Sequence, residues 1–402
     1  MKKILILGAA KNQVPLILAA KAENYYVIVC DWTNDNPGLP YVDKHYRVST
    51  MDRDAVMDVA IQEHIDGVIS NSEPAMENVA YISEKLGLVG NSLNTLQILL
   101  SKDKFRSFQE SIGIYAPKHY VFDKFDDYLE TAKQMKVPFI VKPVENSGSR
   151  GTTKIERIDA EYLLKAFNEN VAFSRNKHCS IEEYVEMPSL NVIDGDIFVH
   201  NGIILWNGMF LSTRSKFNPL VPMTQSYPLV LSDGEMKTVK DTLSKIVVKS
   251  GIKHGEYNIE AYYTKKGELF IIEINPRQGG NSIPEMIQAH SGVDMYKLLV
   301  TTAVRDDEYF ENILKSGYSC NYISRFPVFS HKDGIYCGLF IDDSIKKYVV
   351  SIEELKQKGE PINMCRNATD VVGFVNLEFE SYNVQCKICD QLEEKIYPIV
   401  RK

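Results

Sequence analysis

Three polar residues lie two apart in an otherwise hydrophobic segment, ELFIIEINPRQGG, which spans residues 268–280. They are Glu273, Asn275 and Arg277. In a β-strand this spacing places all three side chains on one face, because successive side chains point to opposite sides. The preceding segment, YNIEAYY, carries Glu260, and a Lys-Lys-Gly turn joins the two segments into a predicted hairpin. The pattern therefore predicts two carboxylates, an amide and a guanidinium gathered at one place.

Oxygen ligands of this kind are typical of a Mg²⁺ site, which proteins build from one or two carboxylates together with substrate phosphates. Two carboxylates buried together without a cation would repel each other and lose hydration. We therefore expect Glu260, Glu273 and Asn275 to be metal ligands, and Arg277 to neutralise charge that develops on a phosphate. The structural alternative is a buried ion pair between Glu273 and Arg277.

Two segments upstream have features suited to the rest of a nucleotide. Lys142 ends the apolar strand PFIVKP, just before the loop ENSGSRGT of residues 145–152, whose small residues let backbone N–H groups approach phosphate oxygens. This loop is not a G-x-x-x-x-G-K-[ST] motif. The alternatives are a strand-end lysine that reaches solvent and a plain flexible turn.

The segment SIEEYVE, residues 180–186, carries two adjacent acids on a predicted strand. An adenine ring needs an acceptor for its amino group and backbone groups for its ring edge. Glu182 would accept from the amino group, and the Glu183 carbonyl and the Val185 amide would complete the contact. Paired acids on a surface strand are the alternative interpretation.

The elements that must position these residues follow from hydrophobic patterning. KKILILG and YVIVCDW read as strands around a helix, and further helices near 52–64 and 74–86 flank the strand DGVISN, so residues 1 to about 95 form a predicted doubly wound domain. Its first turn lacks the G-x-G-x-x-G pattern, which argues against a dinucleotide despite Asp31 at the end of the second strand.

The central region contains a predicted helix over 101–115, a strand from Cys179 that runs out at Pro188, and a hairpin with Asn201-Gly202 as its turn. A helix near 234–250 precedes the two strands that carry Glu260 and Glu273. After these, shorter strands and helices form a small α+β tail.

Composition excludes several classes of protein. The net charge of −7 gives no basic field for nucleic acid, and no apolar run approaches the roughly 20 residues of a membrane helix. Seven scattered cysteines indicate reduced thiols and a cytoplasmic location. Cys386 and Cys389 form a lone C-x-x-C, which we expect to be two ordinary positions in a strand or the turn after it.

The order of these motifs resembles the ATP-grasp superfamily, from DK on a helix through VKP, NSGSRGT and EEYVE to NIE and IEINPR. The most similar branch includes carbamoyl-phosphate synthetase large subunits, biotin carboxylases, amino-acid ligases and purine-synthesis ligases. The resemblance implies a mixed α/β and α+β fold. A Rossmann-like domain over 1–100 would precede a two-lobed ATP-grasp domain over 101–310, with its lid subdomain at about 118–185, and a C-terminal α+β subdomain would span 311–402.

The resemblance also assigns roles to residues. Those implied for ATP are the phosphate-contacting lysines Lys104 and Lys142, the glycine-rich lid of Ser147, Gly148, Ser149, Arg150 and Gly151, and the adenine clamp of Glu182, Glu183 and Val185. Lys102 is a rival for the role of Lys104. Glu260, Glu273 and Asn275 resemble the ligands of two Mg²⁺ ions, for which Mn²⁺ can substitute. Arg277 resembles the arginine that steadies an acyl-phosphate. Neither Asn191 nor Asp194 is a clear match for the ribose-binding acid of many relatives.

The implied reaction activates a carboxylate as an acyl-phosphate, which an amine then converts to an amide or peptide bond with release of ADP and phosphate. The protein needs no nucleophile of its own for this chemistry. Gly279 and Gly280 would let the backbone approach the reacting carbonyl, and Arg214 is a candidate for a substrate carboxylate or else a solvated loop arginine. The alternatives are bicarbonate activation through carboxyphosphate and a non-catalytic nucleotide-binding protein. The resemblance also suggests a homodimer, and it leaves the acid and the amine open.

Overall fold

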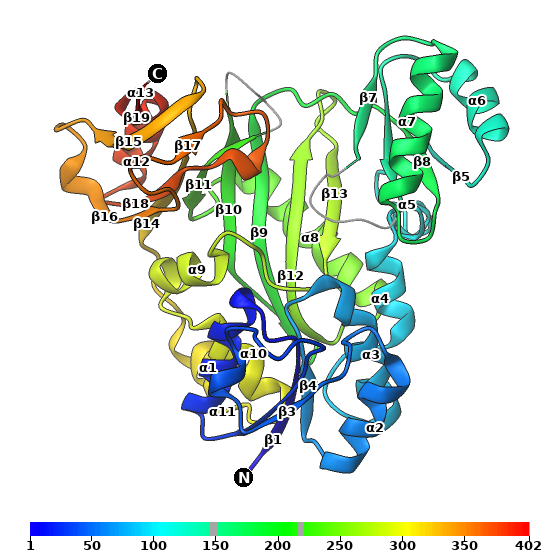
Figure 1. Ribbon diagram of the computed structural model, residues 1–402, viewed down its shortest axis with the longest axis vertical. Coiled ribbons are helices and arrows are strands. Elements are labelled where there is room, and N and C mark those ends of the chain that lie inside the picture. Colours follow the sequence, from blue (N-terminus) through cyan, green and yellow to red (C-terminus); the bar gives the residue numbers. More distant parts are fainter. Residues whose placement is uncertain (145–150, 216–220, 402) are drawn as a thin grey trace.

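A computed structural model of the chain describes residues 1–144, 151–215 and 221–401. Figure 1 shows an N-terminal sheet at the bottom, long central strands above it, and two further lobes at the upper right and upper left. Parallel and antiparallel sheets are both present, which confirms the predicted mixed fold class. No helix in these ranges combines the length and the apolar composition needed to cross a membrane.

The N-terminal sheet is fully parallel, with the strand order β3-β2-β1-β4. Its strands are nearly continuous apolar runs because helices cover both faces of a parallel sheet of this kind. The elements of this region are β1 (Lys3–Leu7), η1 (Lys11–Gln13), α1 (Val14–Ala22), β2 (Tyr26–Cys30), η2 (Leu39–Tyr41), β3 (Lys44–Tyr46), α2 (Arg53–Glu63), β4 (Gly67–Ile69), η3 (Glu73–Ala75) and α3 (Met76–Leu86).

Two consecutive helices, α4 (Leu93–Leu100) and α5 (Lys102–Ser111), connect this region to the lobe at the upper right of Figure 1. That lobe is an antiparallel sheet in the order β5-β8-β6-β7, and Tyr128 of α6 and Phe167 of α7 belong to the buried cluster on it. Its elements are β5 (His119–Phe122), α6 (Phe125–Gln134), β6 (Phe139–Pro143), β7 (Thr153–Ile155), α7 (Ala160–Phe173) and β8 (Cys179–Glu183). The expected extension of β8 to Pro188 is wrong, because the strand ends at Glu183.

An eight-stranded sheet in the order β13-β12-β9-β10-β11-β14-β18-β16 forms the centre of the molecule. Its strands are β9 (Asn191–His200), β10 (Ile203–Arg214), β11 (Pro222–Tyr227), β12 (His254–Tyr263), β13 (Leu269–Asn275), β14 (Tyr322–Val328), β16 (Val349–Glu354) and β18 (Gly373–Phe379). The predicted turn between β9 and β10 is present. Asn201 and Gly202 both have positive φ there, at 51° and 79°, as a tight two-residue hairpin turn requires.

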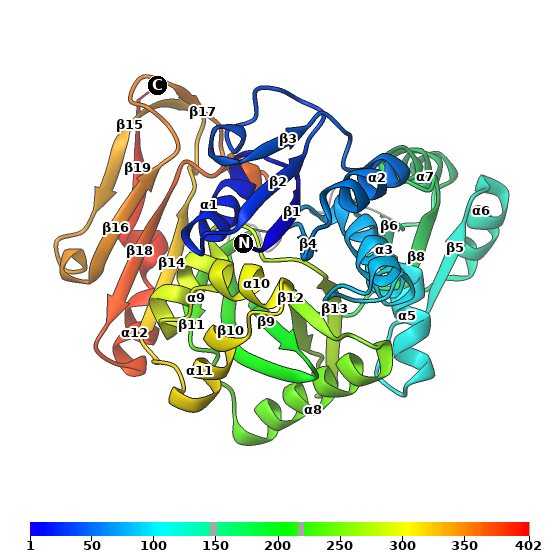
Figure 2. The same ribbon diagram turned by 90° about the horizontal axis from the view of Figure 1, so that it is seen from below.

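Helices cover the two faces of this sheet. Helix α8 (Asp233–Ser250) packs on one face through Leu243 and Ile246. Helices α9 (Ile283–Ser291), α10 (Met295–Ala303) and α11 (Glu308–Ser316) share the other face with the N-terminal region, in one buried cluster. Figure 2 shows α8 on the side of the central strands away from β1–β4. The N-terminal region is therefore fixed to the sheet through α10 and its neighbours.

The C-terminal lobe adds a three-stranded sheet in the order β17-β15-β19. Its elements are β15 (Gly334–Ile341), η4 (Lys346–Tyr348), β17 (Pro361–Ile362), η5 (Ala368–Asp370), α12 (Tyr382–Cys389), α13 (Leu392–Lys395) and β19 (Ile396–Arg401). The expected strand or turn at Cys386 and Cys389 is wrong, since both lie on α12. The Ser381 side chain caps this helix by accepting a hydrogen bond from the Val384 N–H. A serine at this position is typical of a helix start, and the prediction from hydrophobic patterning did not take it into account.

Candidate active site

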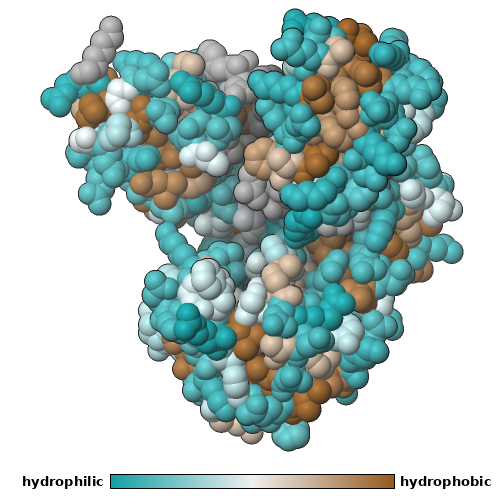
Figure 3. Space-filling view, turned by 45° about the vertical axis from the view of Figure 1, so that its right-hand side comes forward, coloured by the Kyte–Doolittle hydropathy of each residue, from teal (hydrophilic) through white to brown (hydrophobic). Residues whose placement is uncertain are grey.

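We call the lobe built from β5 to β8 with α6 and α7 the lid lobe. A cleft of about 570 Å³ lies between the lid lobe and the β12–β13 hairpin. Figure 3 shows this side of the molecule as mostly hydrophilic and hollowed between its lobes. The residues predicted from the sequence that line the cleft are Lys142, Glu182, Glu183, Val185, Glu260 and Glu273. The structure thus gathers residues that lie as far apart in the chain as β6 and β13.

The β12–β13 hairpin places the two predicted metal-binding carboxylates opposite each other. Glu260 and Glu273 are register partners in the antiparallel pairing of β12 with β13. The register of this pairing shifts between Glu260 and Ala261. The Asn275 side chain donates a hydrogen bond of 2.9 Å to Glu273 Oε1. The predicted convergence of the three residues is therefore present in the geometry of the hairpin.

The two carboxyl groups of this pair have different electrostatic surroundings, and their pKa values shift in opposite directions. Burial raises the pKa of Glu260 to about 8, and the neighbouring charges of Asp194 and Glu273 add to the rise. Burial would also raise the pKa of Glu273, but Lys102, Asn275 and Arg277 together lower it below its ordinary value. One carboxyl group thus holds a proton while the other stays charged, as expected where two acids face each other without a cation.

This donor set suits a metal that completes its coordination with ligand oxygens. Among the described residues, no group of three or more His, Cys, Asp or Glu side chains is arranged to hold a metal ion by itself. Mg²⁺ takes only one or two carboxylates in many nucleotide sites, where phosphate oxygens and water supply the remaining positions. Glu260, Glu273 and Asn275 fit that pattern.

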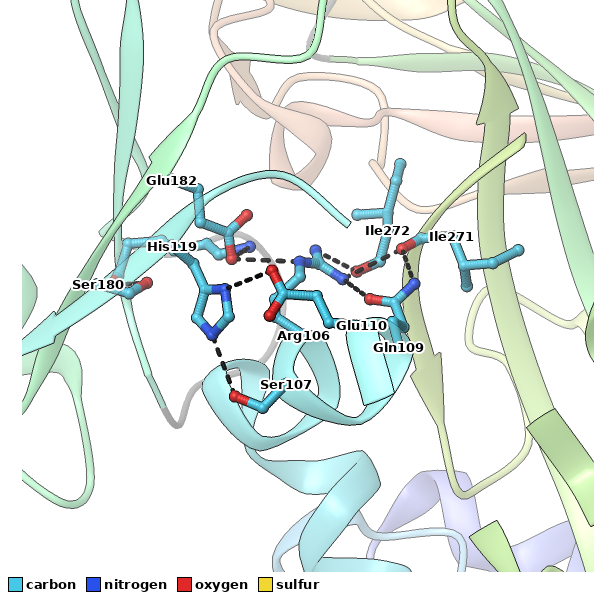
Figure 4. A network of polar contacts seen from close by, with 10 residues as sticks. Arg106, Ser107, Gln109, Glu110, His119, Ser180, Glu182, Ile271 and Ile272 are labelled. Carbon is cyan, nitrogen blue, oxygen red and sulfur yellow. Dashed lines mark hydrogen bonds and ion pairs between the residues drawn. The ribbon is translucent and has the colours of Figure 1, made fainter. Parts of the chain in front are cut away.

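A buried network joins the lid to the hairpin at the other wall of the cleft. Lys142 Nζ lies 2.6 Å from Glu182 Oε1, and Arg106 Nε lies 3.4 Å from the same oxygen. Arg106 also donates to the carbonyl oxygens of Ile271, at 3.1 Å, and Ile272, at 2.7 Å. Figure 4 shows the Arg106 side chain between Glu182 and these two backbone carbonyls. Helix α5, strand β8 and strand β13 therefore meet at one guanidinium.

The network fixes the position of Glu182 and keeps its carboxyl group charged. Burial would raise the pKa of this carboxyl, but Arg106 and Lys142 lower it below its ordinary value. Both cations contact Oε1 of this carboxylate, and Glu182 also lines the cleft, so the contact of its side chain with adenine stays a prediction. The same burial lowers the pKa of Lys142 to about 8, although Glu182 opposes the shift.

The structure separates the two candidate lysines of α5. Lys102 lines the cleft and contributes to the lowered pKa of Glu273. Lys104 is exposed and does not line the cleft. Two helical residues that are two positions apart point in nearly opposite directions, because each residue turns the helix by about 100°. The geometry therefore favours Lys102, the rival, over Lys104.

Arg277 takes a partner that the sequence did not indicate. Its Nη2 lies 3.7 Å from Glu73 Oε2, in the short η3 helix of the N-terminal region, and its Nη1 donates to the Gln278 carbonyl at 2.9 Å. The ion pair considered for Glu273 and Arg277 is thus replaced by one with Glu73. Arg277 still lies close enough to the hairpin to influence the pKa values of Glu260 and Glu273.

The two glycines after Arg277 differ from each other. The Gly279 N–H donates a 2.7 Å hydrogen bond to Asp196 Oδ2. A Cβ atom on Gly279 would lie 2.5 Å from Ile283 Cδ1 and 2.8 Å from Asp196 Oδ1, so any larger residue here would displace these side chains. A Cβ atom on Gly280 would meet nothing within 4 Å. Neither glycine lines the cleft between the lid and the hairpin.

The remaining predicted residues have separate positions. Arg214 ends β10, its side chain is 15% exposed, and its Nη2 lies 3.9 Å from Glu260 Oε2, so it is not a solvated loop arginine; its contact with a substrate carboxylate stays a prediction. Asp194 is the β9 register partner of Glu260 and is buried, which raises its pKa to about 6. Gly151 has a φ of 80°. Ser147, Gly148, Ser149 and Arg150 lie outside the described residues.

Sequence reasoning missed two buried ionic groups of this site, Arg106 and Glu73. Both sit on elements other than the one that carries their partners, and nothing near them in the chain marks the contact. One weak signal exists for Arg106. Arg106 and Gln109 are three residues apart on α5, so they share a helix face, and the structure buries both.

Known proteins are similar to this chain in sequence and in fold. Residues 135–285 match the family model described as ATP-grasp domain. A formate-dependent phosphoribosylglycinamide formyltransferase from Bacteroides thetaiotaomicron is 24% identical over 193 residues, which cover 47% of this chain and 49% of that protein. The chain spans about half or less of the length of the first curated relatives that it matches.

Several solved structures superpose on this chain over its whole length, and two of them are described next. The L-amino acid ligase from Bacillus licheniformis superposes with a TM-score of 0.78 and 19% identity, over 100% of this chain and 99% of that one. The biotin carboxylase domain dimer of a 2-oxoglutarate carboxylase from Hydrogenobacter thermophilus, in complex with MgADP, ADP and bicarbonate, superposes with a TM-score of 0.69 and 15% identity, over 100% and 91%. Both likenesses concern the fold. The part of the chain from residue 135 to residue 285, which contains the β12–β13 hairpin and much of the cleft, is thus similar to ATP-grasp domains, and the chain as a whole shares its fold with these two proteins.

Proposed function

We propose that the chain is an ATP-dependent ligase that activates a carboxylate as an acyl-phosphate and joins it to an amine. The observation that carries this proposal is the pairing of Glu260 with Glu273 at the edge of a cleft that also contains Lys102 and Lys142. Two facing acids suit divalent metal ions, and two lysines suit phosphate oxygens. ATP with two Mg²⁺ ions is the ligand set that matches both.

Each residue has a defined task in this proposal. Lys102 and Lys142 hold the phosphate oxygens of ATP, and the Glu183 and Val185 backbone receives the adenine edge. Glu260, Glu273 and Asn275 would hold Mg²⁺, which when bound supplies charge neutralisation on the phosphates. The lid of Ser147 to Gly151 would cover the phosphates. Arg277, steadied by Glu73, would face the group that is transferred.

The chemistry follows from positions and charge. An oxygen of the substrate carboxylate attacks the γ-phosphorus, and ADP leaves. The amine nitrogen then attacks the acyl carbon, and phosphate leaves while the nitrogen loses a proton. The chain contributes binding, orientation and electrostatic stabilisation of the transferred charge, which is the main source of catalysis in phosphoryl transfer.

The proposal extends to organisation and location. The substrates are a small carboxylate and a small amine, the enzyme is a homodimer, and it works in the cytoplasm. The N-terminal region to about residue 100, the ATP-grasp region to about 310 and the C-terminal region are its three structural units. The solved biotin carboxylase domain is described as a dimer, and this supports the proposed dimer.

A substrate screen tests the activity directly. Purified protein is incubated with ATP, Mg²⁺ and pools of amino acids and small carboxylates, and ADP and phosphate are measured. We expect acid-dependent ADP release, and hydroxylamine should trap the activated acid as a hydroxamate. ADP release that never depends on any acid would contradict the proposal. Tight ATP binding without turnover would point instead to a nucleotide-binding protein.

A second reaction uses the same site. Bicarbonate could replace the organic acid, giving carboxyphosphate, and the solved carboxylase domain that superposes on this chain was described with bound bicarbonate. ADP release that depends on bicarbonate alone, and not on any added carboxylate, would favour this alternative over the ligase.

A further inference from the structure

A second pocket, of about 340 Å³, lies in the C-terminal lobe, where α13 and β19 meet the ends of β10, β11 and β14. Figure 1 shows this lobe at the upper left, opposite the lid lobe. The volume is within the roughly 300–1,000 Å³ of pockets that hold small organic ligands. Among the described residues, none lines both this pocket and the cleft between the lid lobe and the β12–β13 hairpin. The pocket is therefore separate from the site proposed for ATP.

The inner wall of the pocket is apolar. Four side chains that are each 6% exposed or less form it: Met223, Phe326, Phe329 and Ile396. Two of them are aromatic, and aromatic rings pack well against other rings in offset or edge-to-face contacts. An apolar group that enters such a pocket is stabilised by about 25 cal/mol for each Å² of apolar surface removed from water. The inner part of the pocket thus suits the apolar body of a small ligand.

A carboxylate lies where the pocket opens towards solvent. Glu393, the second residue of α13, lines both the pocket and an outer hollow of about 520 Å³ on the surface of the lobe. Ser330 and His331 also line both spaces, so the pocket and the hollow adjoin. A ligand can therefore enter from the surface and pass the Glu393 side chain on its way to the apolar wall.

The described lining gives this carboxylate no cationic partner. Its Oε1 accepts a hydrogen bond of 3.1 Å from Ser215 Oγ, and no Lys or Arg is among the described residues that line the pocket. The Glu393 side chain is partly exposed, so water solvates its charge while the pocket is empty. The pocket thus combines an apolar interior with one negative charge at its mouth.

We propose that this pocket binds a small organic ammonium ion, with its apolar body against the inner wall and its ammonium group on the Glu393 carboxylate. An N–H group of an ammonium ion forms a charge-assisted hydrogen bond with a carboxylate. An anionic ligand would be repelled by Glu393. A neutral apolar ligand would displace water from the carboxylate without replacing its hydrogen bonds, which costs free energy.

This inference goes beyond the ligase reaction and does not depend on it. The pocket shares no described lining residue with the cleft, and its test measures binding without ATP or turnover. Failure of the ligase proposal would leave the pocket as it is, and failure of binding here would leave the ligase proposal intact.

Calorimetric titration of the full chain with phenethylamine tests the pocket. This probe has an aromatic ring and one ammonium group, and we expect a Kd of about 1 mM or lower. The same ring without the charge, in 2-phenylethanol, and the same charge without the ring, in ethylamine, should each bind about tenfold more weakly. The anion 3-phenylpropanoate should not bind. The proposal would be overturned if phenethylamine did not bind, or if any of the other three compounds bound as tightly.

Variants assign the binding to this pocket. Glu393→Gln keeps the shape of the side chain and an oxygen that can accept from Ser215, but it removes the charge. It should weaken phenethylamine binding by about tenfold and leave the binding of 2-phenylethanol unchanged. Glu394→Gln is the matched control, because the neighbouring Glu394 is exposed and lines only the outer hollow. Its Kd for phenethylamine should stay within about twofold of that of the unmodified protein.

A filled pocket gives a second, independent readout. Cys365 lines the pocket and is not fully buried, and its backbone N–H bonds to the Ser330 carbonyl whatever its side chain is. Cys365→Phe adds a ring at this wall and should abolish phenethylamine binding, with thermal unfolding to confirm that the variant is folded. An unchanged Kd in Glu393→Gln, or equal losses in Glu393→Gln and Glu394→Gln, would overturn the proposal, as would full binding by a folded Cys365→Phe.

Discussion

Arg106 and Glu182 form a buried ion pair that ties helix α5 to the lid, with Nε and Oε1 3.4 Å apart. Arg106 is 1% exposed and also donates to two carbonyls of β13. We predict that Arg106→Met lowers the free energy of unfolding by about 3 kcal/mol, because it leaves the buried Glu182 carboxylate with one cation and removes the guanidinium donors from the Ile271 and Ile272 carbonyls, of which the Ile271 carbonyl keeps a hydrogen bond from Gln109. Urea unfolding measures the change.

The control is Arg157→Met, which removes an exposed arginine of the same lobe. It should change the free energy of unfolding by less than about 0.5 kcal/mol, as surface substitutions usually do. Equal stabilities of the two variants would show that Arg106 does not hold the lid to the hairpin.

The two lysines of α5 give a matched pair for ATP binding. Lys102 lines the cleft, and Lys104 is exposed outside it. We predict that Lys102→Ala weakens ATP binding at least tenfold, equivalent to about 1.4 kcal/mol, while Lys104→Ala changes it less than about twofold. Calorimetric titration with ATP measures both. The reverse order of effects would return the phosphate contact to Lys104.

The hairpin shows what could be predicted from the sequence. A period of two in Glu273, Asn275 and Arg277, with a turn before it, sufficed to place Glu260 opposite Glu273. Local patterns also gave the N-terminal parallel sheet and the Asn201-Gly202 turn. Each of these depends on neighbours in the chain or on one hairpin.

The contacts that the sequence did not indicate have a common physical origin. The choice between Lys102 and Lys104 depends on which side of α5 faces the cleft, and the ion pair of Glu182 with Arg106 joins two elements that are distant in the chain. The pairing of Arg277 with Glu73 crosses about 200 residues of chain and joins two lobes. Such contacts are set by tertiary packing, which no local periodicity encodes.

The carboxylate pair predicts a pH dependence of metal binding. The pKa of Glu260 is about 8 in the metal-free protein, whereas that of Glu273 is lowered. Glu260 must lose its proton to bind Mg²⁺, so the apparent Kd for Mg²⁺ rises as the pH falls below 8, approaching a factor of about ten per pH unit for one proton. Above this pH the Kd should become constant.

Titrations with Mg²⁺ at pH values between about 6 and 9 check this slope. Glu260→Gln should bind Mg²⁺ more weakly and lose the pH dependence, because the group that competes for the proton is gone. A constant Kd for the unmodified protein across this range would remove Glu260 from the metal site.

Glu73 predicts a contribution of the N-terminal region to catalysis. Its carboxylate is 3.7 Å from Arg277 Nη2, and its side chain is only 10% exposed. We predict that Glu73→Gln lowers kcat for acid-dependent ADP release by about tenfold to a hundredfold, since a displacement of about 1 Å at a reacting group can cost a factor of this size. The KM for ATP should stay within about twofold, because Arg277 does not line the ATP cleft.

Glu77→Gln is the matched control, because Glu77 lies four residues further on and its side chain is 41% exposed. Its kcat should equal that of the unmodified protein. A loss confined to kcat in Glu73→Gln, with normal thermal stability, would identify Glu73 as a positioning residue for Arg277. If both variants retained full kcat, the ion pair would serve only to join the N-terminal region to the sheet, and Arg277 would hold its position through its hydrogen bond to the Gln278 carbonyl alone.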